Sequence, residues 1–570
     1  MNGAPAGHVA ILSGAEAIAR TAADEGFQLA FVYPGTSELA LCSALAQALL
    51  VSNSRGDAEA VFFAGGANLV PPARAIAVVH GARGLTNAAG AIADLRRNEI
   101  PAVVVVGLPS TQSRRFQPPH GEDDLVAGVG AFAKAAFEIL DEPGDLTDVA
   151  VSEAMRAACR GAASLPTGPV ILGLPQDVLE FRGHRVANKV PQTEEKPASG
   201  ELAAAALDIA NALRPVILVD DLYIRGGAYA LRTLDTFADA IAAPVFQVAY
   251  RRGPMLFAQL NEDDVVNFRG HIEPDNPAAV AISSADMIIT VEDRNMYPRV
   301  VGPLPACRKV ALSSNPAMTA KNEYLGSGDR LIVGYPPLLL EELTERLHPL
   351  KPRSPLPVQS EPSEDDASTL AERFVEAIGA SLSRLDDPYI VDDSQMLGGL
   401  IARHFRKLPR ETTIFGDHGG FVGAGSSFAV GLSIANPTRP VLCLLGDQGF
   451  TNGVKALVAA GEQATRLVFV VANNGESVSL RKQARSLERV GDEAPNWLRN
   501  VSSLNYTAVA RAAGLSATQV DLYADGPYAV ERAITDGFAT GMPSFVEILL
   551  PPLGDFWDGV WTVQGRDHER

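Results

Sequence analysis

Short apolar runs that end in glycine, aspartate, asparagine, histidine or proline recur along the chain and strongly constrain its fold. Residues 75–80 and 441–446 are two such runs, and each is followed by an Ala-rich segment with helical spacing of its apolar residues. Continuous apolar runs of this length suit strands that are buried on both faces, as in parallel sheets covered by helices. The pattern therefore predicts an α/β fold built from open parallel sheets.

The alternation occurs in three successive parts of the chain. Residues 185–200 and 349–368 are rich in Pro, Ser, Glu and Lys and lack periodic apolar positions, so we expect linkers there. A chain of 570 residues also exceeds the size at which a single core stops growing. We predict three open parallel-sheet domains, over residues 1–184, 200–348 and 369–560.

Composition excludes several classes of protein. The chain has 48 Lys and Arg against 67 Asp and Glu, and its net charge of −19 disfavours a nucleic-acid partner. The four cysteines are scattered without a CxxC pair, so neither a disulfide scaffold nor a structural zinc site is expected. No apolar run approaches the roughly 20 residues of a membrane span. No signal-like segment opens the chain, so we expect a cytoplasmic protein without a membrane partner.

Two polar motifs follow neighbouring strands of the third predicted domain. Gly446-Asp447-Gln448 closes one apolar run, and Asn473-Asn474-Gly475-Glu476 closes the next. Because the carboxyl ends of parallel strands meet at one edge of a sheet, we expect these motifs to lie together. Carboxylate, amide and carbonyl oxygens suit Mg²⁺ or Ca²⁺. A helix that begins near residues 451–452 would turn its free N–H groups toward an anion. The motifs predict a site for a divalent metal together with a diphosphate.

With these motifs the chain resembles the thiamine diphosphate-dependent enzymes of the acetolactate synthase, pyruvate oxidase and pyruvate decarboxylase superfamily, over nearly its full length. The family's cofactor signature is GDG followed by NN. The resemblance implies that Asp447, Asn474 and the carbonyl of Glu476 hold Mg²⁺, which clamps the cofactor diphosphate. The residues implied to line the diphosphate are Gly446, Gln448 and Gly449. The glutamine at 448 replaces the last glycine of the signature, so the path of this loop stays open.

Residues 420–431 form a glycine-rich segment similar to the one that precedes the GDG strand in this family. By the resemblance, Val422 is the wedge between the two cofactor rings, and the carbonyl of Gly420 faces the 4′-amino group of the aminopyrimidine. His418, just before the glycines, is a candidate to face the substrate. The candidates to contact the diphosphate from an upstream loop are Asp393, Ser394 and Gln395.

The first part resembles the family's pyrimidine-binding domain. Pro34 and Gly35 end a strand as the family's YPG does, and Thr86 and Asn87 belong to a turn similar to GPGxTN. The second part resembles the central domain, which binds a flavin or nucleotide in some members. Because it contains no GxGxxG motif, we expect it to be mainly structural and to hold no flavin.

The family's chemistry also requires a carboxylic acid against N1′ of the aminopyrimidine. In an apolar slot such an acid has a raised pKa and shares a proton with the ring. Glu59 is the candidate. Two alternatives stay open: Asp57 takes this position, or no acid is present.

Substrate-facing residues are expected in the loop after residues 102–108 and just past the NN motif. Gln117 or His120 in the first loop is the candidate proton donor, or orients the first intermediate. Three cations either hold a substrate carboxylate or phosphate or lie at the solvated surface: Arg114, Arg115 and Arg481.

The resemblance implies a thiamine diphosphate- and Mg²⁺-dependent enzyme that breaks or makes a C–C bond on a 2-oxo acid. Protonation after loss of CO₂ makes it a decarboxylase, and addition to an aldehyde, ketone or acyl-CoA makes it a carboligase. A lyase acting on a 2-hydroxyacyl-CoA is the nearest alternative. A catalytically silent homologue and a nicotinamide or flavin oxidoreductase are the others. We expect a homodimer or homotetramer with the cofactor at the interface.

Overall fold

The computed structural model describes most of the chain. The described ranges are residues 11–72, 74–189, 199–248, 256–258, 260, 263–272, 277–296, 301–347, 369–416, 420–463, 465–486, 495–500, 504–552 and 554–557. The expected linker at residues 349–368 and the candidate His418 lie outside these ranges, as do residues 190–198 of the other linker.

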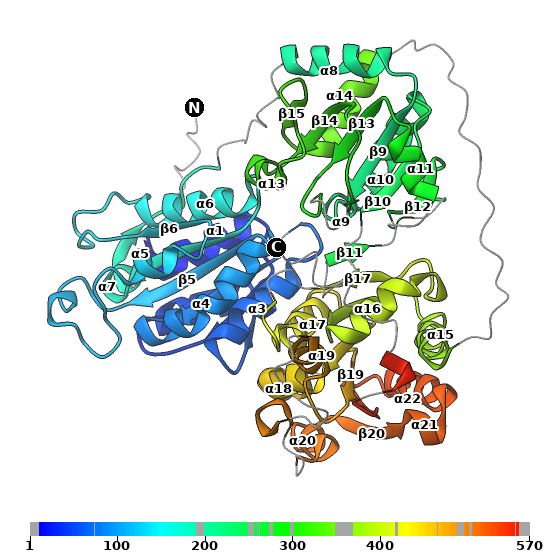
Figure 1. Ribbon diagram of the computed structural model, residues 1–570. Helices are drawn as coiled ribbons and strands as arrows, with labels where there is room; N and C mark the ends of the chain where they lie inside the picture. The colour runs from blue at the N-terminus through cyan, green and yellow to red at the C-terminus, as the bar shows by residue number, and fades with distance from the viewer. Residues whose placement is uncertain are drawn as a thin grey trace, which may run out of the picture.

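The first part forms a six-stranded parallel sheet in the order β3-β2-β4-β5-β7-β6, blue to cyan in Figure 1. Side chains of its central strands alternate between two hydrophobic clusters, so both faces are buried. The strands are β2 (Leu29–Tyr33), β3 (Leu50–Asn53), β4 (Ala75–His80), β5 (Ala102–Leu108), β6 (Ala135–Glu138) and β7 (Pro169–Pro175). The helices are α1 (Gly14–Asp24), α2 (Leu39–Ala48), α3 (Asp57–Ala67), α4 (Ala82–Arg97), α5 (Leu125–Gly130), α6 (Ala150–Ala163) and α7 (Gln176–Glu180). A short antiparallel pair joins β1 (Leu12–Ser13) and β8 (Arg182–His184).

The central part, green in Figure 1, is a second parallel sheet in the order β12-β10-β9-β13-β14-β15. The strand order reverses direction between β9 and β13, which is the switch point of a doubly wound sheet. The strands are β9 (Pro215–Asp220), β10 (Val245–Val248), β12 (Phe268–His271), β13 (Met287–Val291), β14 (Arg308–Ser313) and β15 (Arg330–Val333). The helices are α8 (Ser199–Asn211), α9 (Asp221–Ile224), α10 (Gly227–Ala240), α11 (Pro277–Ser283), α13 (Pro316–Asn322) and α14 (Pro336–Leu347).

The third part, yellow to red, has a seven-stranded sheet in the order β11-β17-β16-β18-β19-β21-β20. Its neighbours are parallel except for β11, an antiparallel edge strand contributed by the central part. The strands are β11 (Leu256–Ala258), β16 (Tyr389–Asp393), β17 (Thr413–Phe415), β18 (Val441–Gly446), β19 (Leu467–Asn473), β20 (Ser516–Asp521) and β21 (Ser544–Leu549). The helices are α15 (Leu370–Leu382), α16 (Met396–Arg403), α17 (Ala424–Ala435), α18 (Asp447–Gln463), α19 (Val478–Ser486), α20 (Tyr506–Ala512), α21 (Leu522–Asp525) and α22 (Pro527–Ala539).

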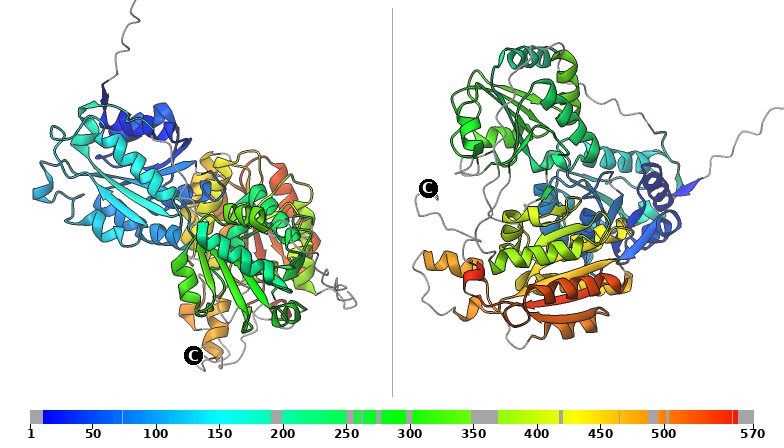
Figure 2. Two further views of the ribbon diagram at one scale, coloured as in Figure 1. Left: turned by 90° about the horizontal axis from the view of Figure 1, so that it is seen from above. Right: turned by 90° about the vertical axis from the view of Figure 1, so that its right-hand side faces the viewer.

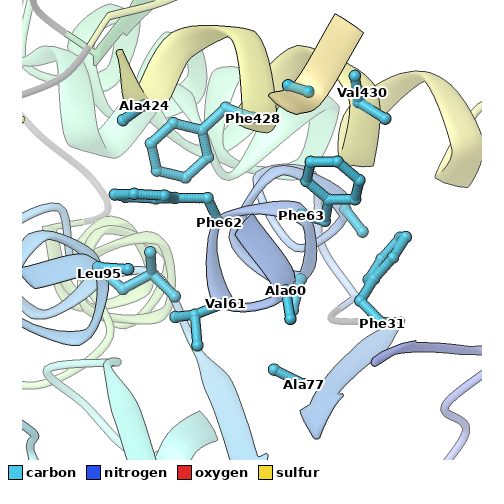
Figure 3. Packing of buried hydrophobic residues seen from close by; sticks show 14 of the residues in the cluster. Phe31, Ala60, Val61, Phe62, Phe63, Ala77, Leu95, Ala424, Phe428 and Val430 are labelled. Carbon is cyan, nitrogen blue, oxygen red and sulfur yellow. The ribbon is translucent and has the colours of Figure 1, made fainter. Parts of the chain in front are cut away.

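Helices α3 and α17 join the first and third parts through one shared core. Both helices are apolar around nearly their whole circumference and are almost completely buried, as expected of helices packed on every side. Phe62 of α3 packs edge-on against Phe428 of α17, with ring centroids 5.3 Å apart (Figure 3). Gly66 and Gly431 allow close approach, because a Cβ added at either would lie within about 2.1 Å of a carbonyl oxygen of the other helix. Figure 2 shows the first and third parts side by side in both views.

The carboxyl edge of the central sheet meets the first part through buried charges. Asp220 ends β9 and Asp221 follows it, and Glu292 and Arg294 follow β13; all four are buried. A nitrogen of Arg294 lies 3.5 Å from a carboxylate oxygen of Glu99 in the first part. The first part therefore packs against the edge at which doubly wound sheets often bind ligands.

Burial in this network gives Glu292 a pH-dependent effect on stability. Desolvation raises the pKa of Glu292 from 4.5 to about 8. The folded protein then keeps a proton that the unfolded chain releases above pH 4.5, so this group lowers stability as pH rises from about 4.5 to 8. We expect Glu292→Gln to match the wild type at pH 4.5. At pH 8 the variant should be more stable by a few kcal/mol, since one pKa unit corresponds to about 1.4 kcal/mol.

Urea unfolding at three pH values measures this difference. The exposed Glu345 of the same part offers a control, because Glu345→Gln should leave the pH dependence of the wild type unchanged. An equal pH dependence for the wild type and Glu292→Gln would contradict the assignment.

The prediction of three open parallel-sheet α/β domains is confirmed. Among the residues described, no helix combines the length and the apolar character needed to cross a bilayer.

Candidate active site

An open pocket lies at the carboxyl ends of β16, β18 and β19, where parallel sheets hold their ligands. The structure brings both third-part motifs of the sequence to this pocket. The predicted residues that line it are Asp393, Ser394, Gln395, Val422, Gly446, Asp447, Gln448, Gly449, Asn474 and Glu476. Ser477, Ser479 and Trp557 are also part of its wall.

Three polar groups gather inside this pocket as a candidate metal site. The end of the Asn474 amide lies 3.0 Å from Oδ2 of Asp447 and 2.5 Å from the carbonyl oxygen of Glu476. An amide NH₂ in this position would donate to both oxygens. With its oxygen in this position, three oxygens converge at about the spacing of adjacent ligands around Mg²⁺, which binds each at about 2.1 Å. Burial raises the pKa of the Asp447 carboxyl to about 6, a cost of desolvation that a bound cation would offset.

The side chain of Glu476 is held by an ion pair. Its carboxylate pairs with Arg481 of α19, and both side chains are buried. Arg481 is therefore not a solvated surface cation, and its guanidinium already neutralises a carboxylate. Arg114 pairs with Glu138 at 2.8 Å, and Arg115 lies over the ring of Phe116.

The three candidates at the end of β16, residues 393–395, have different environments. The Asp393 carboxylate accepts N–H groups of Gly423 and Gly425 at 2.7 and 3.1 Å, so it anchors the start of α17. The Ser394 hydroxyl bonds to Asp392 and accepts the amide of residue 398. Gln395 has a positive φ of 54°, and its amide oxygen accepts a bond from the hydroxyl of residue 479 at 3.3 Å in the pocket wall. All three residues line the pocket, but Asp393 is acidic and Ser394 is held by Asp392, so Gln395 is the candidate for a diphosphate contact.

The glycine-rich segment places Val422 on the wall of the same pocket. Its carbonyl accepts a bond from the Asn452 side chain at 3.3 Å. Gly420 and Gly423 have φ values of 74° and 101°, which a glycine adopts without strain. A second cavity opens between the first and third parts. Its lining includes Glu59, Phe62, Phe421, Ser427, Asn452 and Lys455.

The two acidic candidates near the start of α3 have different surroundings. Glu59 lines the second cavity, where its carboxylate lies 3.1 Å from Nζ of Lys455 in α18. Asp57 is buried to the same degree as Glu59 and lies against α4, where it accepts the side-chain N–H of Asn87 at 3.3 Å. Burial raises the pKa of the Asp57 carboxyl, and this hydrogen bond offsets the shift only in part.

The first sheet also carries a polar cluster at its carboxyl edge that includes residues the sequence motifs did not identify. Nδ1 of His80, at the end of β4, lies 3.0 and 3.1 Å from the two carboxylate oxygens of Glu38. The ring of His120 packs against His80 with centroids 4.2 Å apart. Gly35 of the YPG turn is required here, because an added Cβ would lie 2.3 Å from Nδ1 of His80. The available signal was positional: Glu38 and His80 each lie just after or at the end of a buried strand.

Three further predicted residues belong to the first part: Pro34, Thr86 and Gln117. Thr86 donates its hydroxyl to the carbonyl of residue 82 within α4. Gln117 is exposed with a φ of 45° and donates to Asp123 at 2.5 Å. Pro34 follows β2 directly.

Two models of known protein families match the chain, one in its first part and one in its third part. Residues 12–127 match the family described as thiamine pyrophosphate enzyme, N-terminal TPP binding domain, and residues 396–548 match the corresponding C-terminal TPP binding domain.

Two relatives extend over almost the whole chain. Benzoylformate decarboxylase of Pseudomonas aeruginosa is 25% identical, covering 92% of this chain and 96% of the relative. The large subunit of acetolactate synthase isozyme 3 of Escherichia coli is 24% identical, covering 92% of each. The structure of a thiamine diphosphate-dependent 4-hydroxybenzoylformate decarboxylase of Rhodococcus jostii superposes with a TM-score of 0.76 at 20% identity, over 95% of this chain and 99% of that one. The chain belongs to the thiamine diphosphate-dependent enzyme superfamily of acetolactate synthases and benzoylformate decarboxylases.

Proposed function

We propose that this chain is a thiamine diphosphate- and Mg²⁺-dependent enzyme that cleaves or forms a C–C bond beside the carbonyl of a 2-oxo acid. The observation that carries the proposal is the convergence of Asp447, Asn474 and the Glu476 carbonyl in an open pocket. When bound, the cofactor supplies a carbon nucleophile and an electron sink, and the protein supplies binding, orientation and proton transfer.

The residues that would hold the cofactor come from one edge of the third sheet. Asp447, Asn474 and the carbonyl of Glu476 would bind Mg²⁺. The proposed diphosphate contacts are Gln395, Gly446, Gln448 and Gly449, beside the first N–H groups of α18. Val422 and Gly420 would support the rings. Because the lining of this pocket comes from the third part, we propose that a second copy of the chain contributes the pyrimidine-binding residues in a homodimer or homotetramer.

Two observations favour Asp57 over Glu59 as the acid against the aminopyrimidine. The Glu59 carboxylate is already paired with Lys455. Asp57 is buried with a raised pKa, which an acid that shares a proton with a ring requires. We therefore expect Asp57→Asn to lower cofactor-dependent turnover by at least about 100-fold, within the range of acid–base catalysis. Glu59→Gln should stay within about threefold of the wild type.

Both variants are tested by steady-state turnover and by thermal stabilisation with thiamine diphosphate and Mg²⁺. If Glu59→Gln loses turnover and Asp57→Asn keeps it, the role belongs to Glu59. Wild-type turnover in both variants would favour the absence of any acid.

Product identification tests the function itself. We propose incubation of the protein with thiamine diphosphate and Mg²⁺ on pyruvate, benzoylformate, pyruvate plus an aldehyde, and a 2-hydroxyacyl-CoA. A decarboxylase gives an aldehyde and CO₂ from the 2-oxo acid alone, and a carboligase gives a hydroxyketone or a 2-hydroxy-3-oxo acid. A lyase cleaves the C–C bond beside the thioester carbonyl of the 2-hydroxyacyl-CoA and gives an aldehyde and formyl-CoA. Thermal stabilisation by the cofactor without any product would support the silent homologue and contradict the proposal.

A further inference from the structure

We propose that Asn500 positions the Asp447 carboxylate for Mg²⁺, and that the side chain of Gln448 holds the Asn500 amide in place. This inference rests on the proposed function and adds two positioning residues to its metal site. It also gives a role to Gln448, the residue that replaces the last glycine of the GDG signature.

The metal loop, residues 474–476, is paired with a short segment that ends at Asn500. Glu476 and Arg499 form an isolated antiparallel bridge. The backbone N–H of Asn500 donates to the carbonyl of Gly475 at 2.9 Å. Asn500 is thus attached through its backbone to the loop that supplies two of the three proposed metal ligands.

The side chain of Asn500 lies between Asp447 and Gln448. Its Oδ1 is 3.5 Å from Nε2 of Gln448. Burial raises the pKa of the Asp447 carboxyl to about 6, and the Asn500 amide is the first of the contacts that lower this pKa. Because Oδ1 of Asn500 faces the donor on Gln448, the NH₂ group of the same amide is the end that faces the carboxylate.

The NH₂ group of Asn500 is a buried donor. Among the described residues it has no hydrogen bond of regular geometry, which is costly for a buried polar group. The carboxylate of Asp447 is the acceptor beside it. Oδ1 of that carboxylate already accepts the backbone N–H of Gln448 at 2.8 Å, and Oδ2 faces Asn474 in the proposed metal site. Donors that hold a carboxylate in this way orient its free lone pairs toward a metal.

The same arrangement accounts for a glutamine directly after Asp447. Gln448 lines the pocket, where a glycine would place no side chain. Its contact with Asn500 turns the end of the side chain toward residue 500. The backbone N–H groups at the start of α18 are then the groups beside the proposed diphosphate.

The test compares Asn500→Ala and Gln448→Ala with a matched control, Asn436→Ala. The control removes an amide that donates to the carbonyl of Leu432 at the end of α17. At saturating thiamine diphosphate, we expect the Mg²⁺ concentration for half-maximal thermal stabilisation to rise by about 10- to 100-fold in Asn500→Ala. It should rise by about three- to tenfold in Gln448→Ala, because the Asn500 amide loses its orientation. Asn436→Ala should have the wild-type value.

A second set of measurements distinguishes positioning of the metal ligand from support of the fold. Mn²⁺ in place of Mg²⁺ reports binding directly, since the EPR signal of free Mn²⁺ falls as the ion binds. Asn500→Ala should weaken Mn²⁺ binding by a factor similar to that for Mg²⁺. Without metal or cofactor it should keep the urea midpoint of the wild type. At saturating Mg²⁺ its kcat should stay within about threefold of the wild type, so the loss appears in the metal requirement.

The double variant tests whether the two residues act as a unit. If Gln448 acts by orienting Asn500, then Gln448→Ala adds nothing once the Asn500 amide is gone. The double variant should therefore have the Mg²⁺ requirement of Asn500→Ala alone. Additive effects of the two substitutions would overturn the role of Gln448.

These outcomes separate the inference from the proposed function. A wild type stabilised by thiamine diphosphate with Mg²⁺, together with an unchanged Mg²⁺ requirement in Asn500→Ala, would overturn the positioning role alone. A lower urea midpoint with an unchanged Mn²⁺ affinity in Asn500→Ala would also overturn it, because the residue then only supports the fold. A wild type that neither binds Mn²⁺ nor gains stability from the cofactor with Mg²⁺ would overturn both the proposed function and this inference.

Discussion

Asp447→Ala is expected to abolish stabilisation by thiamine diphosphate with Mg²⁺ and to lower turnover by more than about 1,000-fold. Asp447 offers the one carboxylate of the proposed metal site, beside an amide and a carbonyl. Without it the two neutral oxygens bind Mg²⁺ weakly, and the diphosphate loses its clamp. For the wild type, a cofactor concentration 100 times its Kd adds about 2.7 kcal/mol of stability, so the loss is readily measured by thermal unfolding.

A matched variant separates this effect from disturbance of the sheet. Asp521 ends β20 at the same edge of the third sheet, where it caps α21 through the N–H groups of residues 523 and 524. Asn caps helices about as well as Asp, so Asp521→Asn should behave as the wild type in both assays. Full cofactor stabilisation of Asp447→Ala would contradict the metal assignment.

Gly431→Ala is expected to lower the free energy of unfolding by more than a substitution at an exposed surface position does. The added Cβ would lie 2.0 Å from the carbonyl oxygen of Phe63, so α17 and α3 must separate. Overpacking of a core costs about 1–3 kcal/mol, and here the resistance is backbone, not a flexible side chain. The reciprocal change, Gly66→Ala, meets the carbonyl of Phe428 at 2.1 Å and should have a similar effect. The urea midpoint of unfolding measures both.

The control is a helical glycine in open space. Gly200 of α8 has no atom within 4 Å of an added Cβ, so Gly200→Ala should stabilise the chain by roughly 0.5–1 kcal/mol. A Gly431→Ala protein with the urea midpoint of the wild type would show that α3 and α17 are not packed this closely.

Much of the fold follows from local sequence. Runs such as β5 and β18 are apolar throughout, and a strand of that kind has few places outside the interior of a parallel sheet. The polar residues after β18 and β19 were predicted to meet because parallel register brings equivalent strand ends together, and the pocket contains both. Periodicity and topology suffice for such inferences.

Side-chain partners far apart in the sequence were not predictable in this way. Glu59 was proposed from its position alone, and its pairing with Lys455 depends on how α3 packs against the third part. Arg481 was expected at the surface or against substrate, yet it lies buried beside Glu476 within its own segment. The contact between Glu38 and His80 needs the order of β2, β4 and β5, which no motif specifies. Pairwise contacts depend on tertiary packing, and the sequence patterns report only burial and period.

The antiparallel strand β11 also bears on how the chain can be divided. It comes from the central part yet pairs with β17 from Leu256 opposite Phe415 to Ala258 opposite Thr413. A fragment that starts at residue 369 would leave the outer N–H and C=O groups of β17 unpaired, and such an exposed margin recruits strands from other molecules. The excised third part should therefore self-associate, and the central part serves the intact chain as a cover against that aggregation.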